Sequence, residues 1–212
     1  MTQLADAPRI EPARRTRRLA GVEVNELLTS SVAALLTILL IAEGITILNM
    51  RGLRGPHMFI GLMLIPPIAL KIASTGYRFV RYYTGAPVYV AKGPPQLALR
   101  ALAPLLVATT AMIFVTGVWL LLLGHRSDQV LMLHKVAFIV WSGVFGVHFL
   151  AHLPGAGRSL RAAWGSGPSH RPRTPGRVVT AALVATSLCL GLVLALALLS
   201  HIGAWHRDYG FF

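Results

Sequence analysis

The chain has 212 residues, of which 55% are hydrophobic and 13% charged, and its mean hydropathy is +0.64. Soluble domains carry about 25% charged residues, so this composition argues against a soluble globular enzyme. The single cysteine, Cys189, excludes a disulfide framework and any multi-cysteine zinc or iron–sulfur site. A net charge of +13 would suit a nucleic-acid binder. However, the arginines are scattered between long apolar stretches, which is typical of an integral membrane protein.

Five stretches are apolar enough to cross a hydrocarbon core about 30 Å thick, which requires about 20 residues of helix. They cover residues 27–49, 57–80, 101–123, 130–153 and 178–200. In the second stretch, Pro66 and Pro67 predict a kink, because proline removes a backbone donor and crowds the preceding turn. The sequence therefore predicts an all-α membrane protein with five transmembrane helices. Helices one to four form an up-and-down bundle, and the fifth is an extra helix.

The connections predict how the chain is divided. Residues 52–56 and 124–129 are short enough for tight turns, whereas residues 84–96 are rich in glycine and proline and predict an extended loop. No small-residue cleavage site follows the polar N-terminus, so we expect an uncleaved signal anchor. The expected parts are a basic cytoplasmic segment (1–26), a four-helix transmembrane bundle (27–153), a mobile basic Gly/Pro-rich cytoplasmic linker (154–177), and the fifth helix with a short external tail (178–212).

The lysines and arginines predict the orientation in the cell membrane, because cytoplasmic segments carry an excess of them. Four lie on one side of the predicted spans, namely Arg51, Arg54, Arg126 and Arg207. Fourteen lie on the other side: Arg9, Arg14, Arg15, Arg17, Arg18, Arg78, Arg81, Lys92, Arg100, Arg158, Arg161, Arg171, Arg173 and Arg177. We expect a cytoplasmic N-terminus and an external C-terminus. In this orientation, we expect the basic residues to set the topology and to contact anionic lipid, and not to bind nucleic acid.

Histidines lie at membrane depth in the second and fourth predicted helices. Polar groups there are costly and point to function. The two helices run in the same direction, so His57 and His134 share a depth near the outer face. Fourteen residues separate His134 from His148, which is nearly four helical turns, so both project from one face about 21 Å apart. His152 lies one turn further along the same side.

Two histidines at equal depth on facing helices suit one haem b, whose iron accepts an axial nitrogen on each face. Zinc or non-haem iron would require more ligands, and no carboxylate or cysteine lies at that depth. The alternatives are that these histidines extend toward lipid headgroups or form hydrogen bonds between helices. Three arginines in the outer turns are within reach of haem propionates, although they are equally well interpreted as solvated loop charges: Arg51, Arg54 and Arg126.

Two longer motifs carry a resemblance to a known family. They are HMFIGLMLIPPIALKIASTGYRFVRYYTG at 57–85, followed by GPP at 93–95, and LHKVAFIVWSGVFGVHFLAHL at 133–153. Together they resemble small bacterial membrane proteins of the cytochrome b561-type and ferric-reductase-like transmembrane haem families, over roughly residues 27–153. The resemblance implies two stacked haems held by two histidine pairs. It would assign His57 and His134 to an outer haem and His148 to one side of an inner haem.

Two further charged residues lie within the predicted spans. Lys71 occupies the position where the family pattern has its fourth histidine, so we expect one haem and leave the second open. A lysine at this depth must be neutral, paired or facing a watery cavity. Glu43 lies about 10 Å below the outer end of its helix and Lys71 about twice as deep, so we do not expect an ion pair between them. Glu43 is a candidate for proton relay or for contact with haem or quinol; the alternative is a protonated carboxyl bonded to a neighbouring helix.

These patterns favour a haem b membrane subunit of an oxidoreductase, which passes single electrons between a quinol or cytoplasmic donor and a separate redox partner protein outside. No catalytic residues are evident, because the sequence has no Gly-rich phosphate loop, nucleotide-binding domain or catalytic triad. The alternative is a haem-free five-helix membrane scaffold, or a transporter of protons or small molecules. Transporters more often show repeated, interrupted helices.

Overall fold

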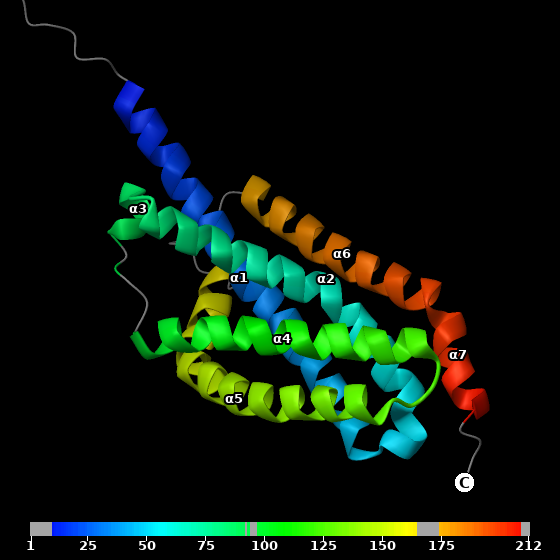
Figure 1. The fold of residues 1–212 in the computed structure, drawn as a ribbon. Coiled ribbons are helices and arrows are strands. Elements are labelled where there is room, and N and C mark those ends of the chain that lie inside the picture. Colours follow the sequence, from blue (N-terminus) through cyan, green and yellow to red (C-terminus); the bar gives the residue numbers. More distant parts are fainter. Residues whose placement is uncertain (1–9, 92, 94–96, 165–173, 209–212) are drawn as a thin grey trace, which may run out of the picture.

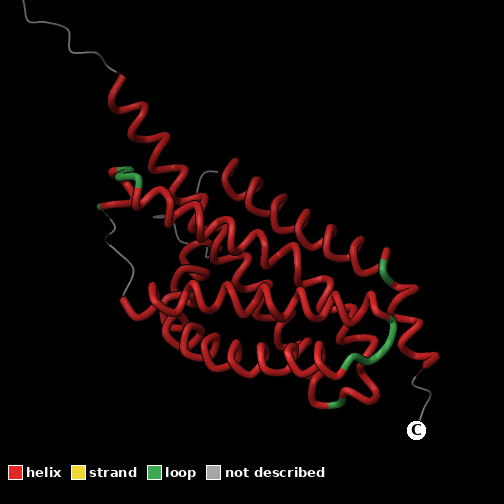
Figure 2. The backbone as a smooth tube through the Cα atoms, viewed as in Figure 1, coloured by secondary structure: helices red, strands yellow, loops and turns green. Residues whose placement is uncertain are grey.

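The computed structural model describes residues 10–91, 93, 97–164 and 174–208. Within these ranges it contains α1 (Ile10–Leu48), α2 (Met50–Tyr83), α3 (Pro87–Val90), α4 (Leu97–Leu123), α5 (Asp128–Trp164), α6 (Thr174–Ala197) and α7 (Leu199–Asp208) (Figure 1). Figure 2 shows that short loops join these helices, and the described residues contain no strand.

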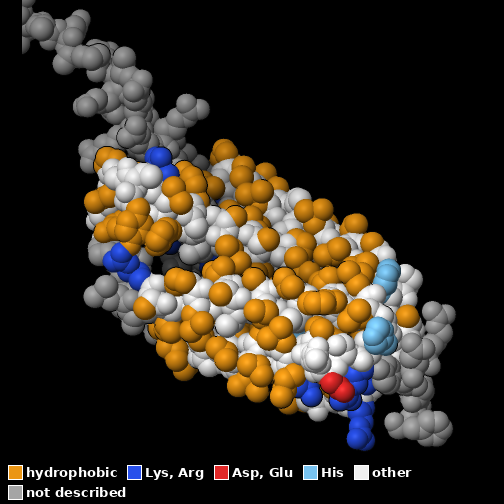
Figure 3. Space-filling view, viewed as in Figure 1, with side chains coloured by type: hydrophobic (Ala, Val, Ile, Leu, Met, Phe, Trp, Pro, Cys, Tyr) orange, Lys and Arg blue, Asp and Glu red, His pale blue; other side chains and the backbone are white. Residues whose placement is uncertain are grey.

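Five helices are long and apolar enough to cross a membrane. The spans are Gly21–Leu48, Met50–Tyr83, Arg100–Leu123, Asp128–His152 and Pro175–Ala197. Large apolar side chains such as Ile139 and Val193 are exposed within these spans. Figure 3 shows hydrophobic side chains over the middle of the visible face, with lysine and arginine toward its two ends. Because soluble proteins rarely expose apolar surface on this scale, the exposed surface faces lipid. The predicted all-α, multi-pass membrane fold is confirmed.

Four of the long helices form a bundle in which α2 and α5 are diagonal partners. α1 packs against α2 and α5, and α4 packs against the same two helices. In the described part of the chain, the backbones of α2 and α5 are not direct neighbours. α6 covers the outside of α2 and α1, and α7 contacts α2 and α4 at one end of the bundle (Figure 1). Side chains of α2 and α5 that point inward therefore meet across the centre of the bundle.

The first connection differs from the prediction. The turn between α1 and α2 lies at Asn49, whose side chain accepts a hydrogen bond from the Gly52 backbone N–H at 3.3 Å. Residues 52–56, predicted as the turn, belong to α2 instead. The backbone of α2 leaves helical geometry at Leu53, not at the Pro66–Pro67 pair where we expected the kink. Proline crowds the turn that precedes it, and Leu53 lies in the turn that precedes Pro56.

The later connections contain more helix than predicted. The turn after α4 begins at Gly124, whose φ of +69° is a conformation that favours glycine, and this confirms the predicted tight turn. The loop after α2 contains one helical turn, α3. The predicted linker at 154–177 is helical up to Trp164 and again from Thr174, because leucine, arginine and alanine before Trp164 favour a helix. Residues 165–173 of that linker lie outside the described residues, as do residues 1–9 of the N-terminal segment.

The predicted external tail also contains structure. Residues 199–208 form α7, and residues 209–212 lie outside the described part of the chain. Ile202 and Trp205 of α7 are buried in an apolar cluster with Leu62, Leu120 and Leu121. A second buried cluster joins α1 to α2 and consists of Leu28, Val32, Leu36 and Leu64. Members of both clusters line the cavity described next.

Candidate cofactor site

A cavity of about 450 Å³ lies inside the bundle. This volume is within the range of small-molecule and cofactor sites, about 300–1,000 Å³. Its lining is mainly apolar and comes from α1, α2, α4 and α5, together with Arg126 of the turn between α4 and α5 and Trp205 of α7. The ionisable residues that line it are Glu43, Arg54, His57, Arg126, His134 and Lys135. The structure thus places five of the sequence-predicted residues around one cavity.

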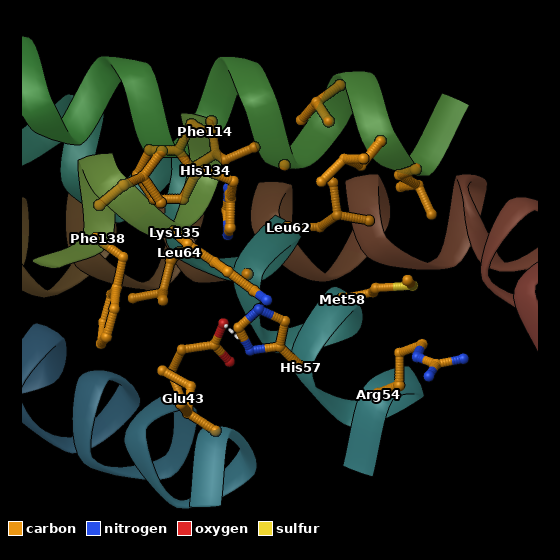
Figure 4. Close-up of a pocket in the computed structure, with 18 of the residues that line it drawn as sticks. Glu43, Arg54, His57, Met58, Leu62, Leu64, Phe114, His134, Lys135 and Phe138 are labelled. Atoms are coloured by element: carbon orange, nitrogen blue, oxygen red, sulfur yellow. Dashed lines mark ion pairs between the residues drawn. The ribbon is translucent and has the colours of Figure 1, made fainter. Parts of the chain in front are cut away.

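His57 of α2 and His134 of α5 meet across the bundle. Their ring centroids are 6.5 Å apart, and the ring planes are almost perpendicular, at 88° (Figure 4). A metal bound to one nitrogen of each ring at about 2.0 Å would put the centroids about 6.2 Å apart, since each nitrogen is about 1.1 Å from its centroid. The observed spacing is close to this value. The predicted equal depth of the two histidines is confirmed, and their spacing fits one metal atom between the rings.

The hydroxyl of Thr116 determines which nitrogen of His134 carries the proton. Thr116 Oγ1 donates to the Met112 carbonyl oxygen at 2.6 Å and lies 2.9 Å from His134 Nδ1. A hydroxyl has one proton to donate, so toward the ring it acts as acceptor and Nδ1 carries the hydrogen. In the neutral imidazole, Nε2 then has the free lone pair. This is the arrangement usual for metal-binding histidines, whose second nitrogen donates to a protein group.

His57 has the same arrangement with different partners. Thr46 Oγ1 donates to the Glu43 carbonyl oxygen at 2.5 Å and lies 3.1 Å from His57 Nδ1. Glu43 Oε1 lies 2.9 Å from the same nitrogen (Figure 4), so the expectation that no carboxylate lies at the depth of the two histidines was wrong. Both oxygens accept from Nδ1–H, which again leaves the lone pair on Nε2. The side-chain contacts recorded for both rings, among the described residues, are all at Nδ1. The site therefore offers two oriented imidazole nitrogens.

The predicted propionate-binding arginines differ in position. Arg54 and Arg126 line the cavity, whereas Arg51 is exposed in the first turn of α2 and does not line it. Arg126 Nε also forms an exposed ion pair with Asp128 at 2.6 Å. Lys135, next to His134 in the chain, adds a third cationic side chain to the lining. Cationic side chains that could bind an anionic group are thus present in the cavity lining. They differ from the predicted set because Lys135 is included and Arg51 is not.

Four residues of the site were not predicted from the sequence: Thr46, Thr116, Lys135 and Trp205. Thr46 follows Glu43 by three residues and so shares its helix face, which was a usable signal. Thr116 had no such signal, because its contact with His134 depends on how α4 and α5 are rotated against each other. Trp205 was assigned to an external tail, but it is buried, and its Nε1 donates to the Leu121 carbonyl oxygen at 3.4 Å.

Lys71, His148 and His152 form a separate group that does not line the cavity. Lys71 Nζ donates to the backbone carbonyl of Thr29 on α1 at 2.9 Å. It makes no ion pair with Glu43, as expected. The rings of His148 and His152 are 4.5 Å apart, and Lys71 is close enough to interact electrostatically with both. His148 Nδ1 is buried and has no hydrogen-bond partner in the described part of the chain.

Comparison of the chain with protein-family models, with curated proteins and with solved structures found no match. Within the described residues, no group of three or more histidine, cysteine, aspartate or glutamate side chains is arranged to hold a metal ion. The chemistry that the site can support therefore depends on its own geometry, above all on the pair of histidines.

Proposed function

We propose that this protein is a haem b-binding membrane subunit that transfers single electrons. The observation that carries the proposal is the pair His57 and His134, with ring centroids 6.5 Å apart inside a bundle cavity. Each Nδ1 is held by a threonine hydroxyl, so each Nε2 has a free lone pair. Two nitrogens on opposite sides of a cavity fit the axial ligation of one haem iron, since the macrocycle supplies the other four ligands.

The other residues that line the cavity are also suited to binding haem. Apolar side chains such as Leu64, Phe114 and Phe138 would contact the macrocycle and exclude water (Figure 4). Arg54, Arg126 and Lys135 would neutralise the two propionates. Gly117 keeps the space beside His134 open, because a Cβ at this position would lie 3.2 Å from His134 Cε1. When bound, haem supplies reversible one-electron chemistry.

The predicted orientation in the cell membrane indicates on which side the electron donor and the electron acceptor would bind. With the N-terminus in the cytoplasm, the His57–His134 pair lies in the outer half of the bilayer. The donor would be a quinol or a cytoplasmic reductant, and the acceptor a redox partner protein outside. We propose one haem per chain, because Lys71 bonds to the Thr29 carbonyl and the cavity does not reach His148.

The test is a reduced-minus-oxidised visible spectrum of the purified protein, produced with ample haem. We expect a b-type spectrum that His57→Ala and His134→Ala each largely abolish, because each removes an axial nitrogen. His125→Ala and His201→Ala are the matched controls: neither residue lines the cavity, so both variants should keep the spectrum. Colourless wild-type protein would contradict the proposal and favour the haem-free scaffold or transporter.

A further inference from the structure

The two histidines differ in the charge beside them. His134 Nδ1 is held by the neutral hydroxyl of Thr116, whereas His57 Nδ1 is held by the carboxyl of Glu43 as well as by Thr46. The side chain of Glu43 is only 14% exposed, and its Oε2 is buried without a hydrogen-bond partner in the described part of the chain. Among the described residues that line the cavity, the carboxyl group is therefore on the His57 side.

Glu43 shares the cavity lining with the cationic side chains of Arg54, Arg126 and Lys135, but its closest charged contact in the described part of the chain is with a histidine. Its ion-pair partner among the described residues is His57, which is neutral when it offers a lone pair to a metal. A buried carboxylate is costly unless a positive charge compensates it. Haem bound by two neutral imidazoles has a core charge of plus one when the iron is ferric and zero when it is ferrous. The carboxylate is therefore better compensated in the ferric state.

Building on the function proposed above, we propose that Glu43 is a positioning residue that acts through His57 to lower the reduction potential of the bound haem. By accepting the Nδ1 hydrogen, Glu43 makes the imidazole a stronger donor, as carboxylate partners of metal-bound histidines do. Its negative charge also favours the ferric iron. Reduction adds one electron to the iron, with both axial bonds retained and no proton transferred.

The experiment is an equilibrium redox titration of the haem-loaded full-length protein, followed by its visible spectrum. Glu43→Gln keeps the size and the acceptor oxygen but removes the charge, so its midpoint potential should lie above that of the wild type. Thr46→Val removes the other acceptor of the same Nδ1–H without changing any charge. We therefore expect Thr46→Val to raise the midpoint potential by clearly less than Glu43→Gln does. Both variants should keep the six-coordinate, low-spin spectrum.

Each outcome separates this inference from the proposed function. A wild type without haem overturns the proposed function. Haem-loaded Glu43→Gln with an unchanged or lowered potential overturns only the role of Glu43. If Glu43→Gln does not accumulate, Glu43→Ala replaces it, and the same upward shift is expected. Loss of haem from both Glu43 variants would show that the residue holds the cofactor in place and would overturn its role in setting the potential.

Discussion

Replacing Thr116 by valine tests the tautomer argument without changing the shape of the core. Thr116 is 1% exposed, and valine is close to it in volume, so packing between α4 and α5 is retained. The change removes the oxygen that lies 2.9 Å from His134 Nδ1. A buried donor left without its acceptor costs about 1–3 kcal/mol. Loss of an outer-shell partner of a metal-bound histidine typically weakens binding about 10–100-fold, which agrees with that range.

We therefore expect Thr116→Val to raise the dissociation constant for haem about 10–100-fold, measured by titrating haem into the apoprotein. Thr109→Val is the matched control on the same helix. Thr109 is half-buried, and in the described part of the chain its hydroxyl donates to the Leu105 and Leu106 carbonyls of its own helix, at 2.8 and 3.2 Å. Equal haem affinity in both variants and the wild type would refute the conclusion that Thr116 orients His134.

Two further predictions concern topology and the inner polar group. The excess of lysine and arginine on one side predicts that a reporter fused after Phe212 is active outside the cytoplasm and one inserted near Gly167 inside it; activity of both on the same side would contradict the five-span orientation. Because Lys71 bonds to the Thr29 carbonyl, the wild type and Lys71→Ala should each bind one haem per chain, measured as haem-to-protein stoichiometry, while Lys71→His should bind two. A wild type with two haems, of which Lys71→Ala loses one, would show that Lys71 is a ligand.

The sequence by itself determined the features that depend on distance along a helix. A stretch of about 20 apolar residues has one low-energy solution in a bilayer, since a helix satisfies its own backbone hydrogen bonds. The five spans could be predicted for this reason. The constant rise per residue also placed His57 and His134 at one depth, and Glu43 and Lys71 at different depths. The structure confirms both, because Glu43 bonds to His57 and Lys71 to Thr29.

Tertiary structure decided the features that depend on rotation about the helix axes and on which helices are neighbours. Hydrophobicity is similar all around a lipid-exposed helix, so it does not indicate which face a partner will cover. The diagonal placement of α2 and α5, the hydroxyl of Thr116 beside His134, and the burial of Trp205 follow from packing between helices. The position of the kink in α2 was also decided by the tertiary structure. Pro66 and Pro67 fit within a continuous helix while Leu53 does not, because neighbouring side chains in a membrane bundle can compensate for the backbone bonds that proline removes.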